Sequence, residues 1–180
     1  MDRESAAETR LVRPTLRYRD SLLAALREFQ AEGLYSGYSL ADLEVDLRPF
    51  VQRLLDDEDR AKVPASWVPT THFWLICGAE YLGRVSLRHE LNEHLREIGG
   101  HIGYEIRPSR RRQGFGTAIL GLALPKAREL GLTRILVTCD DDNKASRRII
   151  EHHGGVADRP YAPPGGRVPI LRYWIDLAGI

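Results

Sequence analysis

Apolar residues in the first third of the chain recur with helical spacing after a short strand. Residues 10–17 alternate apolar and polar side chains, which predicts an opening strand. Two amphipathic helices are predicted next, over 19–32, where Asp20 is placed to cap the helix, and over 40–55. Residues 56–69 are first acidic and then rich in proline, which is typical of a surface loop.

The pattern changes to that of strands in the middle of the chain. Residues 71–77 and 80–88 predict two strands joined as a hairpin. Residues 101–107 predict a third strand, which ends before Pro108. The intervening residues 89–98 show no clear period.

The last third of the chain predicts an α/β crossover. A helix begins near Gly114 and runs to about Leu130, and the apolar run 134–139 that follows suits a buried strand. A short helix over 143–153 and a last strand over 170–177 complete the pattern. The expected fold class is α/β, a mixed, twisted sheet with helices on both faces.

Composition restricts the classes to which this protein can belong. With 180 residues, of which 43% are hydrophobic, the chain is long enough for one domain with one core. Its 26 basic and 25 acidic residues nearly balance, which argues against a polybasic nucleic-acid or membrane partner. The polar start lacks the core of a signal peptide, no apolar run approaches the ~18 residues of a membrane span, and the two cysteines form no metal motif. We therefore expect a cytoplasmic protein without a metal.

The segment 106–117, Ile-Arg-Pro-Ser-Arg-Arg-Arg-Gln-Gly-Phe-Gly-Thr, lies between a predicted strand and a predicted helix. Gly114 and Gly116 allow the backbone to turn and a ligand to approach its N–H groups, and the first helical turn adds unpaired donors. Three arginines, 110–112, add positive charge beside it. Two interpretations remain open, a pyrophosphate cradle or a tight turn with a solvated arginine run.

Better-known phosphate motifs do not fit this segment. A dinucleotide fingerprint needs a small residue where Ile119 stands, and a P-loop needs a Gly-Lys-Ser/Thr sequence that is absent. The remaining pattern, Arg111-x-x-Gly114-x-Gly116 after Ile-Arg-Pro, resembles the acetyl-CoA motif of the GNAT superfamily of N-acetyltransferases. The order of the predicted elements resembles that family as well, and the string from Gly99 to Gly155 is most similar to a poorly characterised bacterial branch of it.

The resemblance implies a GNAT fold, a mostly antiparallel sheet of six to seven strands, in a single N-acetyltransferase domain over 10–177 that follows a polar extension over 1–9. It also implies an acetyl-CoA-dependent enzyme that transfers the acetyl group directly to a primary amine of a small molecule or peptide. Acetyl-CoA would be the co-substrate, no metal, nucleic acid or membrane would take part, and a homodimer is compatible with the family.

Ten residues match the family's cofactor-binding positions, by main chain or side chain. For Asn143 the alternative is a simple helix N-cap. The ten are Ile106, Arg111, Arg112, Gln113, Gly114, Phe115, Gly116, Thr117, Asn143 and Ser146.

The chemistry that the family performs needs a base more than an acid, because an alkyl amine has a pKa near ~10.4 and a leaving thiol one near ~8.5. Glu105 and His101 are the candidate bases, four residues apart and so on one face of the strand. Many relatives place a tyrosine acid where this chain has Ile150. Either another hydroxyl, such as that of Tyr161, protonates the thiolate or the leaving group departs unassisted. Tyr104 and Tyr173 are further, weaker candidates.

Two other functions are weighed against catalysis. A non-catalytic acyl-CoA sensor is favoured if the missing tyrosine reflects lost activity. An RNA-binding module that uses the arginine run is disfavoured, because no aromatic ladder accompanies the run. If the protein is an enzyme, residues 33–40, 56–70 and 158–168 are expected to surround the acceptor.

Overall fold

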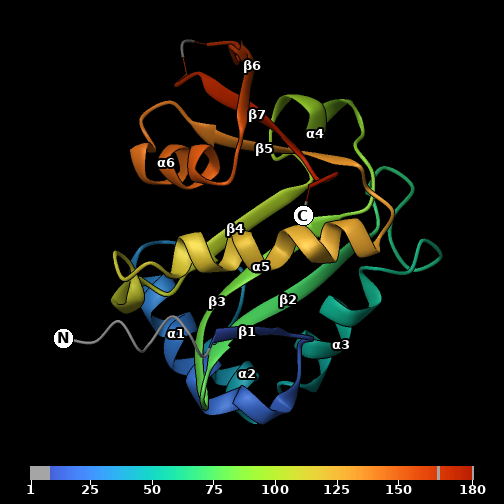
Figure 1. Ribbon diagram of the computed structural model, residues 1–180. Coiled ribbons are helices and arrows are strands. Elements are labelled where there is room, and N and C mark those ends of the chain that lie inside the picture. Colours follow the sequence, from blue (N-terminus) through green and yellow to red (C-terminus); the bar gives the residue numbers. More distant parts are fainter. Residues whose placement is uncertain (1–8, 166, 180) are drawn as a thin grey trace.

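The structure, a computed structural model, describes residues 9–165 and 167–179, so the extension expected over 1–9 lies almost wholly outside the described residues. One seven-stranded sheet has the order β1-β2-β3-β4-β5-β7-β6 (Figure 1). The pair β4–β5 is parallel and the other five pairs are antiparallel. The strands are β1 (Thr9–Val12), β2 (Thr70–Cys77), β3 (Glu80–Arg88), β4 (Ile102–Ile106), β5 (Arg134–Asp140), β6 (Val156–Tyr161) and β7 (Ile170–Asp176). The predicted mixed, mostly antiparallel α/β sheet is confirmed.

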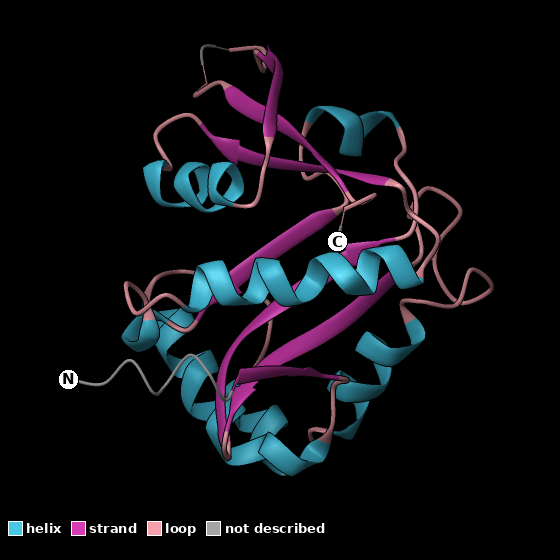
Figure 2. Cartoon of the chain, viewed as in Figure 1, coloured by secondary structure: helices cyan, strands magenta, loops and turns pink. Residues whose placement is uncertain are grey.

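Helices cover both faces of the sheet, and each face has its own apolar core (Figure 2). Helix α5 packs across β3 and β4 with α6 beside it, around Val85, Ile119 and Ile150. The helices α1 to α3 pack on the opposite face against Trp74 and Tyr81. The helices are α1 (Arg19–Ala31), α2 (Leu40–Val45), α3 (Arg48–Asp56), α4 (Glu93–Glu97), α5 (Phe115–Glu129) and α6 (Lys144–His152), with short 3₁₀ turns at Leu16–Tyr18 and Pro108–Arg110. None of the described helices is long and apolar enough to cross a membrane.

Two details of the predicted helices are wrong. Tyr18, and not Asp20, occupies the N-cap of α1, and Asp20 lies inside the first turn. The single helix expected over 40–55 is divided at Asp46, because Pro49 stands in the first turn of α3 and has no N–H with which to continue the preceding helix. The Asp46 carboxylate accepts the Arg48 N–H at 2.9 Å at this junction.

Two elements were not predicted. Strand β6 is mostly exposed and contains Pro160, so it lacks the alternation by which strands are recognised. Helix α4 is a short helix within residues 89–98, capped by the Asn92 side chain, which accepts the Leu95 N–H at 2.9 Å.

The parallel strands β4 and β5 meet at one end only. Their register contains a single pair, Ile102 with Val137. Just before it, the His101 N–H donates to the Leu136 carbonyl at 2.7 Å, and the Leu136 N–H donates to His101 Nδ1 at 2.9 Å. Beyond this pair the two strands diverge.

Gly100 permits the close approach at the joined end. Its φ is +59°, and a Cβ there would lie 2.3 Å from the Leu136 carbonyl oxygen. Both the left-handed backbone and the missing side chain are therefore required.

We predict that Gly100→Ala destabilises the protein by about 2–4 kcal/mol, the sum of backbone strain and steric overlap. Urea denaturation would measure it. Gly37→Ala is the matched control, because no atom lies within 4 Å of a Cβ at that position, and it should change the free energy of unfolding by less than about 0.5 kcal/mol. Equal effects of the two substitutions would contradict this account of the joined end.

Candidate active site

The loop before α5 presents backbone donors to solvent. Gly114 has φ +86° and is the N-cap of α5, and Arg112 also has a positive φ of +59°. The first helical hydrogen bond of α5 is donated by the Ala118 N–H to the Gly114 carbonyl at 3.0 Å. The N–H groups of residues 115–117 therefore have no partner within the helix and form an anion-binding surface at its positive end.

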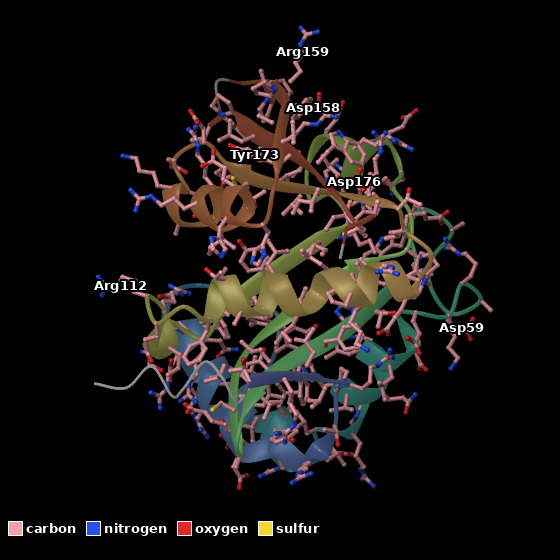
Figure 3. All side chains as sticks on the ribbon, viewed as in Figure 1. Asp59, Arg112, Asp158, Arg159, Tyr173 and Asp176 are labelled. Carbon is pink, nitrogen blue, oxygen red and sulfur yellow. The ribbon has the colours of Figure 1, made fainter. Side chains whose placement is uncertain are left out.

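Most arginines of this loop fasten it to the rest of the protein. The ion pairs are Arg107 with Glu28 at 2.6 Å, Arg110 with Glu80 at 2.8 Å and Arg111 with Glu32 at 2.7 Å. Burial acts to raise the pKa of Glu28, but hydrogen bonds from Arg107 and Ser109 lower it to about 2. Arg112 differs, because its side chain projects into solvent (Figure 3). The arginine run thus holds the shape of the loop, and Arg112 adds a mobile charge beside the backbone donors.

The divergence of β4 and β5 exposes backbone groups along β4. The Arg107 N–H donates to Leu82 in β3 at 2.8 Å, and neighbouring residues of a strand direct their groups to opposite edges. The N–H and C=O groups of Tyr104 and Ile106 therefore point toward β5, which no longer pairs with β4 there. The Ile106 carbonyl accepts a hydrogen bond from Arg111 Nε at 3.1 Å.

A pocket of about 270 Å³ lies in this gap and is lined by residues of β4, β5 and the start of α6. Asn143 is the N-cap of α6, and its Oδ1 accepts the Ser146 N–H at 3.0 Å. The Tyr104 hydroxyl donates to Ser146 Oγ at 3.4 Å, and burial raises the pKa of Tyr104. Burial also raises the pKa of Cys139 to about 11, so this thiol stays protonated at neutral pH and is a poor nucleophile. We call this pocket the wedge.

A larger pocket of about 770 Å³ opens on the opposite face of the sheet. Its lining includes the aromatic side chains of Tyr35, Tyr38 and Trp67 beside polar and charged ones. The expected segments 33–40 and 56–70 contribute to it, whereas residues of α4 stand where 158–168 was expected. We call this pocket the acceptor pocket.

Glu105 is the carboxylate of the acceptor pocket on β4. Its Oε1 forms an ion pair with Arg84 Nε at 2.7 Å and accepts a hydrogen bond from the Tyr35 hydroxyl. Burial raises the pKa of Glu105 to about 7, while the positive charge of Arg111 acts to lower it. The ion pair with Arg84 also favours the ionised form. A carboxylate with a pKa near neutrality is suited to accept a proton at physiological pH.

The other two candidate catalytic residues lie elsewhere. His101 is buried at the joined end of β4 and β5, and burial, followed by the charges of Arg96 and Arg88, lowers its pKa to about 4. Tyr161 ends β6 at the edge of the sheet. The described linings of the wedge and of the acceptor pocket contain neither residue. Ile150 belongs to α6, and its side chain is buried in the core.

Some residues of the acceptor pocket were missed by the sequence analysis. Arg84, His72 and Ser86 carried no motif, and only the register of β2 with β3 and of β3 with β4 brings them beside Glu105. The alternation of polar residues on these strands indicated a polar face but not which residues meet.

Comparison with known proteins identifies the family. Residues 23–156 match the family described as acetyltransferase (GNAT) domain, so the chain belongs to the GNAT family, as the resemblance implied. The class of protein is therefore that of the GNAT acetyltransferases. None of the curated proteins matches the chain.

Solved structures share the fold at low sequence identity. The microcin self-immunity acetyltransferase MccE, in complex with acetyl-CoA and AMP, has a TM-score of 0.67 and 16% identity, covering 94% of this chain and 92% of its own. The ribosomal-protein α-N-acetyltransferase RimL, in complex with coenzyme A, has a TM-score of 0.68 and 17% identity, covering 96% of each chain. A chimeric spermidine N-acetyltransferase SpeG that includes Vibrio cholerae sequence has a TM-score of 0.64 and 17% identity, covering 96% of this chain and 97% of its own.

Proposed function

We propose that this protein is an N-acetyltransferase that transfers the acetyl group of acetyl-CoA directly to a primary amine, with Glu105 as the general base. The observation that carries the proposal is the position of Glu105, whose strand β4 borders both pockets. Its backbone edge faces the wedge, and the Glu105 side chain faces the acceptor pocket. We further propose that residues 10–177 act as one domain, and a cytoplasmic location stays a prediction.

The groups proposed to hold acetyl-CoA lie along one path. The exposed edge of β4 at Tyr104 and Ile106 offers N–H and C=O groups to the amides of the pantetheine arm. The free N–H groups at the start of α5 offer donors to the pyrophosphate. Arg111 and Arg112 add charge, Gln113 lies next to Gly114 at the start of the path, and Asn143 and Ser146 line the wedge opposite β4.

In the proposed reaction acetyl-CoA supplies the acetyl thioester, and this chain supplies the base. Glu105 takes a proton from the amine, and Arg84 and Tyr35 hold its carboxylate in place. The acid position of many relatives is Ile150, which is buried. Among the candidate hydroxyls, Tyr104 lines the wedge and Tyr161 does not, so we propose Tyr104 as the donor to the leaving thiolate.

The acceptor pocket supports a small or amphipathic amine. Three aromatic side chains contribute to its lining, and its described charged residues are Arg53, Arg84 and Arg88 against Asp57 and Glu105. This excess of positive charge disfavours polycationic acceptors. The buried Ile150 supports one alternative, an acyl-CoA-binding domain without turnover, and release of coenzyme A over an amine panel distinguishes the two.

We expect coenzyme A release with amphipathic primary amines such as phenethylamine, and a fall of kcat by about 10² or more in Glu105→Gln, since a positioned base contributes ~10²–10⁴. Because the base must be ionised, kcat/KM of the wild type should fall as pH drops below about 7, and this limb should be absent in the variant. The control Glu129→Gln changes an exposed carboxylate on α5 and should leave turnover unchanged. Full turnover in Glu105→Gln would place the base elsewhere.

Two substitutions at Gly116 test the cradle. A Cβ at this position would lie 2.7 Å from Cδ1 of Ile149, so Gly116→Ala and Gly116→Asp share one steric contact and differ in charge. We expect the thermal stabilisation by acetyl-CoA to be smaller in Gly116→Asp than in Gly116→Ala, because a carboxylate beside the free N–H groups repels the pyrophosphate. Equal thermal shifts in the two variants would show that the pyrophosphate does not bind at this loop.

A further inference from the structure

Three side chains form a hydrogen-bonded chain across the floor of the acceptor pocket. Ser86 Oγ lies 3.0 Å from His72 Nδ1, and His72 Nε2 lies 2.9 Å from Asp57 Oδ2. His72 and Ser86 are directly opposite each other in β2 and β3, and Asp57 is the C-cap of α3. All three line the acceptor pocket.

The partners of His72 determine which ring nitrogen carries the proton. The Asp57 carboxylate accepts hydrogen bonds and donates none, so Nε2 carries the hydrogen. Burial, opposed by Asp57 and reinforced by Arg84 and Arg53, lowers the pKa of His72 to about 4, so the ring is neutral at pH 7. Nδ1 then accepts the Ser86 O–H, which leaves the oxygen lone pairs of Ser86 free.

The hydrogen-bonded chain ends at Ser86, which lies opposite a residue of the wedge. Gly103 is directly opposite Ser86 in β4 and lines the wedge, and Glu105 is two residues further along the same strand and on the same face. The backbones of such diagonal neighbours lie about 7–8 Å apart, within reach of a long side chain such as that of Glu105. The guanidinium of Arg88, 3.6 Å from the place of a Cβ on Gly103, lines both pockets.

We propose that Ser86 is an amine-binding residue whose hydroxyl oxygen accepts one N–H of the acceptor, while Glu105 accepts the other, and that His72 and Asp57 are positioning residues for Ser86. This inference rests on the proposed function. Two fixed acceptors orient the nitrogen lone pair toward the wedge, where the thioester would lie.

The hydrogen-bonded chain from Asp57 to Ser86 is poorly suited to act as a base or to activate a nucleophile. To act as a base or to activate Ser86 as a nucleophile, His72 would have to become positively charged while buried near Arg84 and Arg53. Glu105 has the higher pKa and takes the proton more readily. The hydrogen-bonded chain therefore fixes the direction of one hydroxyl group, and its His72 ring stays neutral.

A consequence is selectivity among acceptors. A primary amine has two N–H groups for the two acceptors, whereas a secondary amine keeps only one when it attacks. Ser86 is thus expected to favour phenethylamine over N-methylphenethylamine.

Nitrogen NMR of the histidine-labelled full chain tests the orientation without any acceptor. At pH 7 the ring of His72 should be neutral with its proton on Nε2, and Asp57→Asn, whose amide can donate to Nε2, should move the proton to Nδ1. Asp56→Asn, one residue away and paired with Lys62 at the surface, should leave the ring unchanged. A charged ring or a proton on Nδ1 in the wild type would overturn the inference.

Kinetics with the two amines test the role of Ser86. Ser86→Ala and Asp57→Asn should each lower kcat/KM for phenethylamine about tenfold, the effect of one hydrogen bond, while kcat/KM for N-methylphenethylamine and the KM for acetyl-CoA stay unchanged. Equal losses with both amines would overturn the inference. Absence of turnover with every amine contradicts the proposed function, whereas turnover with a proton on Nδ1 contradicts this inference alone.

Discussion

The divergence of β4 from β5 is the constraint on which the rest of the site depends. Gly100 and His101 hold the two strands together at one end, and beyond the single pair of Ile102 and Val137 the strands separate. The separation leaves backbone groups of β4 without a partner strand, so they can bond to water or to a ligand. The same separation creates the wedge, and α5 begins with free N–H groups at the end of β4. In the proposed function, one strand thus offers its backbone to one substrate and the Glu105 side chain to the other.

The face of the sheet toward the acceptor pocket is unusually polar for a surface between strands and helices. His72, Arg84, Ser86 and Glu105 lie on a face whose next row along the strands carries the apolar residues Ile76 and Tyr81. Burying these groups is costly unless each is paired, and the ion pair of Arg84 with Glu105 and the chain from Asp57 to Ser86 supply the partners. Polar side chains that replace apolar packing at one place, each with a hydrogen-bond or ion-pair partner, indicate that this place is functional.

Sequence alone predicts most of this fold and part of the site. Periodicity locates the long helices and the hairpin, and Gly114 locates the turn at the start of α5, where a positive φ favours glycine. It misses β6, which is exposed and contains Pro160, and the break before α3. It selects Glu105 and His101 equally, since both lie on one face of β4, and only tertiary contacts separate a pocket carboxylate from an imidazole that joins two strands. Pairings such as His72 with Ser86 depend on strand register, which no local pattern shows.

Amide hydrogen exchange with and without acetyl-CoA tests the central claim, that the free edge of β4 binds the co-substrate. The Tyr104 and Ile106 amides should exchange fast in the free protein and become protected when acetyl-CoA is added, because their N–H groups gain an acceptor. The Arg107 amide, already bonded to the Leu82 carbonyl at 2.8 Å, serves as the internal reference and should change little. Amides of Tyr104 and Ile106 that are protected in the free protein, or that acetyl-CoA leaves unaffected, would contradict the account.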